Sequence, residues 1–208
     1  MLPGPAGRLE GLLQERDARD HAWVALVCHP HPLYGGTMHN KVVHRMASVL
    51  HALDGAVLRF NFRGVGRSQG RFDRGQGELE DARAALAFMR DRYAGARSRL
   101  GGFSFGAWVA ARLAASEPEV EWMVLAAPPV GTESFEVLRG SAVRKLVLQG
   151  TRDDVCPLEA LEREYPTWAE PKELIRIPGA THFFDKQLGA LAQAMDQALS
   201  GPTKDATS

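Results

Sequence analysis

The chain has 208 residues, 45% of them hydrophobic, and its 25 basic and 25 acidic side chains leave no formal net charge. This length favours a single domain over residues 1–200 with a flexible tail over 201–208. Neutrality argues against nucleic-acid binding, which needs a basic excess to neutralise phosphates, and two distant cysteines argue against a secreted disulfide framework.

Short apolar runs alternate with helix-like segments along the chain. Residues Leu9–Gln14 predict an antiparallel edge strand. Six nearly continuous apolar runs then predict strands buried on both faces of a parallel sheet, namely Trp23–Cys28, Ala56–Phe62, Arg99–Phe103, Trp122–Ala127, Lys145–Gly150 and Leu174–Pro178. Helical spacing, alanine content or a leading proline predicts helices at His39–Leu53, Glu78–Tyr93, Ser104–Ala115, Pro157–Glu164 and Phe184–Leu199. This alternation predicts an α/β fold, with a mostly parallel central sheet and helices on both faces.

The chain carries no sign of a membrane segment or an export signal. Its longest apolar stretch, around Trp122–Val130, is well short of the roughly 20 residues that a membrane span needs. The N-terminus has early charges and no apolar core of signal-peptide length. We therefore expect a cytoplasmic protein without membrane or nucleic-acid partners. A small exposed apolar patch would allow a homodimer, although no residue specifies one.

The sharpest motif is Gly102-Phe103-Ser104-Phe105-Gly106, which has the form G-x-S-x-G. It follows a predicted strand and opens a predicted helix, so Ser104 lies at a tight turn. Glycines on either side are needed because such a turn leaves no room for Cβ atoms. The start of the helix offers N–H groups to a developing oxyanion. We expect Ser104 to be a nucleophile, and the alternative is a glycine-rich turn with an N-capping serine.

A serine nucleophile needs a base and an acid that orients the base. His182 is the one histidine that follows Ser104 in the sequence, and it comes just after the last predicted strand. The carboxyl edge of a parallel sheet is where α/β proteins place their sites. Asp153 and Asp154 follow the preceding strand, and either can be the acid while the other caps the helix begun by Pro157. Spacing does not choose between them.

The segment 28–37, rich in proline and glycine, follows the first buried run. It is the natural source of a second oxyanion donor beside the N–H of Phe105. Because proline has no N–H, the candidates are His31, Leu33 and Tyr34.

Two further features have competing interpretations. Four histidines cluster in this region, but no Asp or Glu accompanies them, so we expect no metal site and assign His29 to packing beneath the site; the four are His29, His31, His39 and His44. Arg63 follows the next strand and is expected to be a buried structural cation rather than a ligand for an acidic substrate group.

These features together resemble the α/β-hydrolase superfamily over roughly Leu9–Leu199. The segments HPHPLYGGTMHNKVV and LRFNFRGVGRSQG resemble small bacterial hydrolases related to the dienelactone-hydrolase branch, which includes lidless serine esterases. The resemblance implies a Gly-x-x-Asp-x-Val-x-Pro motif and therefore Asp153 as the acid. Dienelactone hydrolases carry a cysteine at the elbow, so Ser104 here implies ordinary ester chemistry. The short interval Pro128–Ala142, where the superfamily often inserts a lid, implies an open site.

We therefore expect a serine hydrolase that cleaves small-molecule carboxylic esters or thioesters through an acyl-enzyme, without a cofactor. Its apolar walls are expected to come from five aromatic side chains, Tyr34, Phe103, Phe105, Phe135 and Phe183. The alternatives are an acyltransferase or peptidase on the same triad, or a non-catalytic binding protein that retains the fold.

Overall fold

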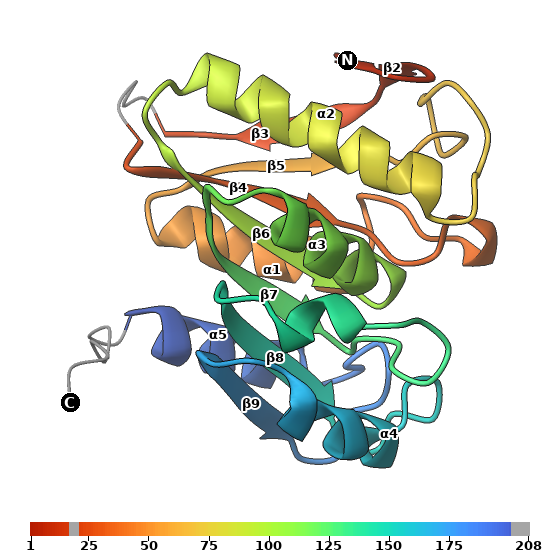
Figure 1. The fold of residues 1–208 in the computed structure, drawn as a ribbon, viewed down its shortest axis with the longest axis vertical. Coiled ribbons are helices and arrows are strands. Elements are labelled where there is room, and N and C mark those ends of the chain that lie inside the picture. The colour runs from red at the N-terminus through yellow and green to blue at the C-terminus, as the bar shows by residue number, and fades with distance from the viewer. Residues whose placement is uncertain (17–20, 201–208) are drawn as a thin grey trace.

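The computed structural model describes residues 1–16 and 21–200, and it consists of three layers with a sheet in the middle (Figure 1). The sheet has seven strands in the order β3-β5-β4-β6-β7-β8-β9. Strand β3 runs antiparallel to β5, and every other neighbouring pair is parallel. This arrangement confirms the predicted α/β fold. The predicted tail, 201–208, lies outside the described residues.

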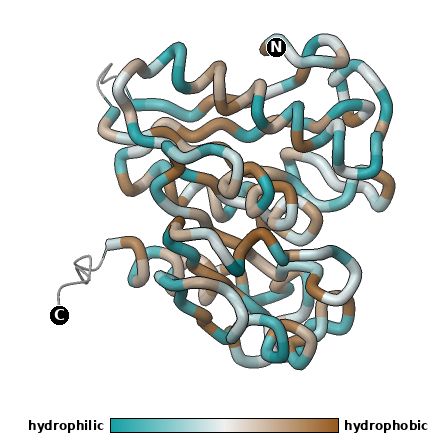
Figure 2. The backbone as a smooth tube through the Cα atoms, in the orientation of Figure 1, coloured by the Kyte–Doolittle hydropathy of each residue, from teal (hydrophilic) through white to brown (hydrophobic). Residues whose placement is uncertain are grey.

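All six predicted apolar runs form strands of this sheet, with ends that differ by at most two residues. Their bounds are β4 (Trp23–Cys28), β5 (Ala56–Phe60), β6 (Arg97–Phe103), β7 (Val120–Ala126), β8 (Arg144–Gly150) and β9 (Lys172–Ile177). Every residue of β4 and β5 is buried, because helices cover both faces of a parallel sheet. Figure 2 shows the resulting hydrophobic stretches along the central strands.

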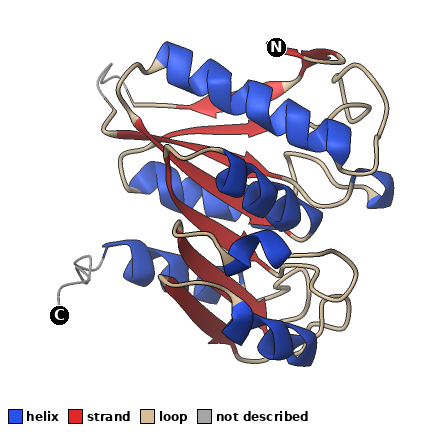
Figure 3. Ribbon diagram, in the orientation of Figure 1, coloured by secondary structure: helices blue, strands red, loops and turns tan. Residues whose placement is uncertain are grey.

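The helices cover the sheet on both sides (Figure 3). On one face lie α2 (Gln76–Arg92), α3 (Phe105–Ser116) and α4 (Leu158–Glu164), and on the other lie α1 (Lys41–Ala52) and α5 (Leu188–Ser200). The side chain of Asn40 caps α1 by accepting from the first free backbone N–H groups. The predicted start of the last helix at Phe184 is wrong. Phe184 and Lys186 have φ of 51° and 61°, which an α-helix does not allow, so α5 begins at Leu188.

The N-terminal segment is more divided than the sequence predicts. The edge strand is confirmed as β3 (Gly11–Gln14), but Leu9 belongs to β2 (Gly7–Leu9), which pairs with β1 (Leu2–Gly4) in a separate hairpin. Leu2 and Leu9 face each other in this pair and are buried. Strands of three residues are too short to leave an alternating pattern.

The carboxyl ends of the parallel strands meet at one edge of the sheet, and the loops that leave them are short. Between β7 and β8, residues 127–143 hold a single turn of 3-10 helix, η2 (Glu136–Arg139), and no lid (Figure 3). Two other such turns, η1 (Pro32–Tyr34) and η3 (Tyr165–Thr167), follow β4 and α4. None of the described helices is long and apolar enough to cross a membrane.

Candidate active site

Ser104 lies at a strained turn between β6 and α3. Its backbone has φ 54° and ψ −123°, a conformation that residues other than glycine rarely adopt. A Cβ on Gly102 would lie 2.1 Å from the carbonyl oxygen of Gly106, and a Cβ on Gly106 would lie 2.3 Å from that of Cys28. Both flanking positions therefore accept glycine only, as expected from the motif.

Three loops bring Ser104, His182 and Asp153 into one hydrogen-bonded row. His182 Nε2 lies 3.2 Å from Ser104 Oγ, and His182 Nδ1 lies 2.9 Å from Asp153 Oδ2. All three side chains are buried. Because the carboxylate accepts the hydrogen on Nδ1, the lone pair of Nε2 faces the serine hydroxyl. This is the arrangement in which an imidazole can remove the serine proton.

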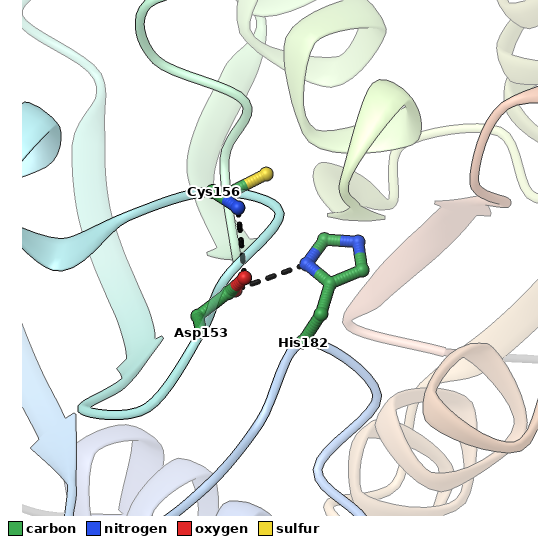
Figure 4. A group of neighbouring side chains, drawn as sticks. All are labelled: Asp153, Cys156 and His182. Carbon is green, nitrogen blue, oxygen red and sulfur yellow. Dashed lines mark hydrogen bonds and ion pairs between the residues drawn. The ribbon is translucent and has the colours of Figure 1, made fainter.

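Four donors hold the carboxylate of Asp153 in place. Its Oδ1 accepts from the backbone N–H groups of Val155 (3.0 Å) and Cys156 (2.7 Å), and its Oδ2 accepts from Gln149 Nε2 (3.1 Å) and from His182. Figure 4 shows the carboxylate between Cys156 N and the imidazole. The structure therefore brings Asp153, and not its neighbour, to the histidine.

Asp154 is exposed and does not take the second role that the sequence suggests. Helix α4 begins at Leu158 without a side-chain cap, so the expectation that the other carboxylate caps this helix is wrong. The Val155 and Cys156 N–H groups before the helix donate to Asp153 instead.

Gln149 is a site residue that the sequence analysis did not single out. It is fully buried in β8, and its Nε2 donates both to Asp153 and, at 2.7 Å, to the carbonyl oxygen of Cys156. It thereby ties the strand to the loop that carries the acid. A polar side chain directly after the apolar residues 146–148 was the available signal.

The hydrogen bonds of the loop after β4 separate the three candidate oxyanion donors. The N–H of Leu33 donates to His31 Nδ1 at 3.2 Å, and the N–H of Tyr34 donates to the His31 carbonyl oxygen at 3.1 Å. The prediction of Tyr34 as an oxyanion donor is therefore wrong, because its N–H is used inside the η1 turn. The N–H groups of His31 and Phe105 have no protein partner among residues 1–16 and 21–200.

A buried histidine fixes the direction of the His31 N–H. The N–H of Phe62 donates to His29 Nε2 at 3.0 Å, so the ring hydrogen lies on Nδ1, which donates to the Pro30 carbonyl oxygen at 2.7 Å. That carbonyl and the His31 N–H belong to one trans peptide and point in opposite directions. The hydrogen bond therefore turns the His31 N–H away from the His29 ring. Burial lowers the pKa of His29 to about 4, which keeps the ring neutral.

A cavity of about 300 Å³ opens over Ser104. It is lined by Pro30, His31, Tyr34, Gly35, Gly36, Asn40, Ser104, Val155, His182 and Phe183. Tyr34, Val155 and Phe183 are 86%, 57% and 43% exposed, so the mouth of this cavity is apolar and open to solvent. No Asp, Glu, Lys or Arg occurs among the described residues that line it.

Three of the expected wall residues lie elsewhere. Phe103 is fully buried, with its ring centroid 5.0 Å from that of His182, so it supports the base rather than the substrate. Phe105 packs in the core beside Phe62, and Phe135 stacks on Trp168. The prediction that these three residues form cavity walls is wrong, because their side chains point into the layers between the sheet and the helices.

Arg63 is buried and forms a two-point ion pair with Asp81, from Nε at 3.0 Å and from Nη2 at 2.8 Å. Its side chain is therefore engaged in the fold, as expected. Among residues 1–16 and 21–200, the four clustered histidines belong to no group of metal-ligating atoms.

Comparison with known proteins agrees with this geometry. A family model described as serine aminopeptidase, S33, matches residues 24–143, more than half of the chain. The chain belongs to this family. An α/β serine hydrolase homologue from Coxiella burnetii is 39% identical, with a TM-score of 0.91 and 95% of each chain covered.

Two further relatives extend over nearly the whole chain. XC6422 from Xanthomonas campestris, described as a serine hydrolase without a lid, is 36% identical, with a TM-score of 0.87 over 98% of this chain and 94% of its own. The uncharacterised protein RP471 of Rickettsia prowazekii is 38% identical over 205 residues, which are 94% of this chain and 86% of that protein. The α/β-hydrolase fold and the superfamily resemblance are confirmed, and membership in a serine hydrolase family supports a hydrolase activity.

Proposed function

We propose that this chain is a serine esterase that cleaves small carboxylic esters or thioesters through an acyl-enzyme. The observation that carries the proposal is the row of hydrogen bonds from Asp153 through His182 to Ser104, at 2.9 and 3.2 Å. A serine hydroxyl next to an oriented imidazole is an activated nucleophile. Apart from water, the proposed reaction uses only the side chains and backbone described above.

In the proposed mechanism, His182 Nε2 takes the Ser104 proton while Oγ attacks the carbonyl carbon. The negative oxygen that forms accepts from the N–H groups of Phe105, at the start of α3, and of His31. The imidazolium then gives its proton to the leaving alcohol or thiol. In the second half of the reaction, water attacks the acyl-enzyme while His182 takes its proton, and the acid is released.

The cavity supports an uncharged substrate with an apolar acyl group. Its volume of about 300 Å³ suits a short acyl chain, and its open mouth allows a longer chain to lie across Tyr34, Val155 and Phe183. Each methylene that these side chains remove from water contributes about 0.8 kcal/mol, or roughly a fourfold rise in kcat/KM.

The family description makes aminopeptidase activity the second candidate. An aminopeptidase recognises the free ammonium group of its substrate, and a buried ammonium needs a carboxylate partner. The described residues that line the cavity include none. Ester hydrolysis is therefore favoured, and acyl transfer to an acceptor other than water remains the closest alternative on the same residues. Two buried free cysteines also agree with the reducing cytoplasm that we propose as its location.

The test is the hydrolysis of p-nitrophenyl esters, from acetyl to dodecanoyl, by the wild type and by Ser104→Ala. Loss of turnover by a factor on the order of 10⁶ in the variant is expected for a working nucleophile. An aminoacyl-anilide series run in parallel decides the peptidase alternative. If the wild type has no turnover on any ester and does not react with a fluorophosphonate, the protein is a binding protein and the proposal is wrong.

The apolar mouth is tested with Val155→Ser, and Val137→Ser is the matched control. Val137 is 41% exposed but lies in η2 and not in the cavity lining. We expect the first variant to flatten the dependence of kcat/KM on acyl length and the control to leave it unchanged. Equal profiles for both variants contradict the role of the mouth.

A further inference from the structure

The mechanism leaves one nucleophilic side chain beside the triad unused. Cys156 is a free thiol, 3% exposed, in the loop that also holds Asp153. Its Sγ, a carboxylate oxygen of Asp153 and a ring nitrogen of His182 all lie within 4.8 Å of one another. Figure 4 shows the three side chains beside one another.

We propose that Cys156, Asp153 and His182 form an inhibitory binding site for a thiophilic divalent cation such as Zn²⁺. Thiolate sulfur, imidazole nitrogen and carboxylate oxygen are the donor types that bind this ion. Zinc ligands at 2.0–2.3 Å from the metal lie roughly 3.5 Å apart in a tetrahedron, so the three groups must approach by about an ångström. Rotation about the Cα–Cβ bond of Cys156 moves its sulfur over such a distance.

Charge and access both favour this site. A Cys156 thiolate and the Asp153 carboxylate together carry two negative charges, which a divalent cation neutralises in a buried position. Zinc binds the thiolate form, so binding displaces the thiol proton, which leaves to solvent. The cavity reaches His182 and the adjacent Val155, so an ion enters from the substrate side. The fourth position is then open to a water molecule.

Occupation of the site stops catalysis through either ring nitrogen. If His182 binds the metal through Nδ1, it loses its hydrogen bond to Asp153, and its remaining hydrogen lies on Nε2. If it binds through Nε2, the lone pair that accepts the Ser104 proton is taken. In both cases the base cannot accept the proton of the nucleophile.

The first experiment measures inhibition by ZnCl₂ of the wild type, Cys156→Ala and Cys28→Ala, each relative to its own metal-free rate. Cys28 is the other free cysteine, buried at the end of β4. Losing an outer partner of a metal costs roughly 10–100-fold in affinity, and losing a ligand costs more. We therefore expect the inhibition constant to rise more than about tenfold in Cys156→Ala only. Chelation should restore activity, and Mg²⁺ should have no effect.

The second experiment does not need turnover, because this proposal rests on the proposed esterase function only for its inhibitory effect. Titration with Cd²⁺ should produce the ultraviolet band of a cadmium–thiolate bond in the wild type and in Cys28→Ala but not in Cys156→Ala. If the cadmium–thiolate band appears but the protein has no esterase activity, the proposed function is refuted and the proposed metal site is still supported.

The proposal is overturned if Cys156→Ala remains as sensitive to Zn²⁺ as the wild type, or if the wild type shows neither inhibition nor the band. Cys156→Ser replaces the alanine variant if that variant does not fold. Its hydroxyl is a far weaker zinc ligand than a thiolate, so the same loss of sensitivity is expected.

Discussion

Replacing Asp153 by asparagine exchanges one oxygen acceptor for an NH₂ donor, and the surroundings of the carboxylate decide where that donor lies. Oδ1 accepts from two backbone N–H groups, those of Val155 and Cys156. These donors cannot turn away, so the amide oxygen of the asparagine must take this position. Its NH₂ group then faces His182 Nδ1 and Gln149.

The size of the effect follows from the proton on His182. Facing a donor, Nδ1 must become an acceptor, so the ring hydrogen moves to Nε2 and Ser104 loses its base. The same loss of tautomer in a serine-protease triad lowers kcat by about 10⁴, which is about 5.5 kcal/mol of transition-state stabilisation. KM should change little, because Asp153 does not line the cavity.

The fold should tolerate this change. Gln149 Oε1 has no hydrogen-bond partner in the described structure, so the glutamine amide can turn over and accept from the new NH₂ group. This rotation of the Gln149 amide removes its hydrogen bond to the Cys156 carbonyl oxygen, which lowers the free energy of unfolding by about 1–3 kcal/mol.

The assay is steady-state hydrolysis of the best ester substrate by Asp153→Asn and, as control, by Asp154→Asn. The control side chain is exposed and one residue away, so its variant should keep wild-type kcat. The reasoning is refuted if Asp153→Asn retains more than about a tenth of wild-type kcat, or if the control carries the loss.

Three further predictions concern the supports of the site. Overpacking typically costs about 1–3 kcal/mol, and Gly106→Ala should cost more than this because the new Cβ meets a backbone oxygen at 2.3 Å. The control Gly140→Ala, whose Cβ has nothing within 4 Å, should leave Tm unchanged. The pKa of His29 falls from 6.5 to about 4 on folding, so the contribution of the neutral ring to the free energy of unfolding is complete above pH 6.5 and is lost as the pH drops toward 4. Urea titrations should show that the free energy of unfolding of the wild type falls by about 3 kcal/mol more than that of His29→Asn over that range. Arg63→Ala should lower the free energy of unfolding by about 3–5 kcal/mol, because the buried Asp81 carboxylate loses its charged partner and keeps only the backbone N–H of residue 63, while kcat of the remaining folded protein is unchanged. A change in KM with intact stability would instead assign Arg63 to substrate binding.

The sequence predicts the parts of the site that local patterns encode. The G-x-S-x-G motif marks Ser104 as an elbow from residues adjacent in the sequence, and a single downstream histidine leaves one choice for His182. The strands follow for the same reason, because burial on both faces forces apolar runs such as Trp23–Cys28. These features depend on local sequence patterns, and for them the prediction and the structure agree.

Other parts depend on hydrogen bonds that no spacing specifies. Tyr34 and His31 are equal candidates until the η1 turn uses the N–H of Tyr34. Phe103 and Phe183 both flank triad residues in the sequence, but the end of β6 directs the Phe103 side chain into the core. Family resemblance implies Asp153 rather than Asp154, and three donors from its loop and β8, together with His182, account for the choice physically.

The strained backbone of Ser104 also links chemical reactivity to the completion of folding. Around its φ of 54°, the Ser104 N–H donates to the carbonyl oxygen of Ala126 in β7, and Gly106 lies close to the carbonyl oxygen of Cys28, the last residue of β4. An unpaired chain has no reason to keep that conformation, so the serine becomes reactive only when the centre of the sheet has formed. The time course of labelling by a fluorophosphonate during refolding should therefore report when the end of β4 docks onto α3. The β1–β2 hairpin packs against α2, so its fraying should leave the signal unchanged.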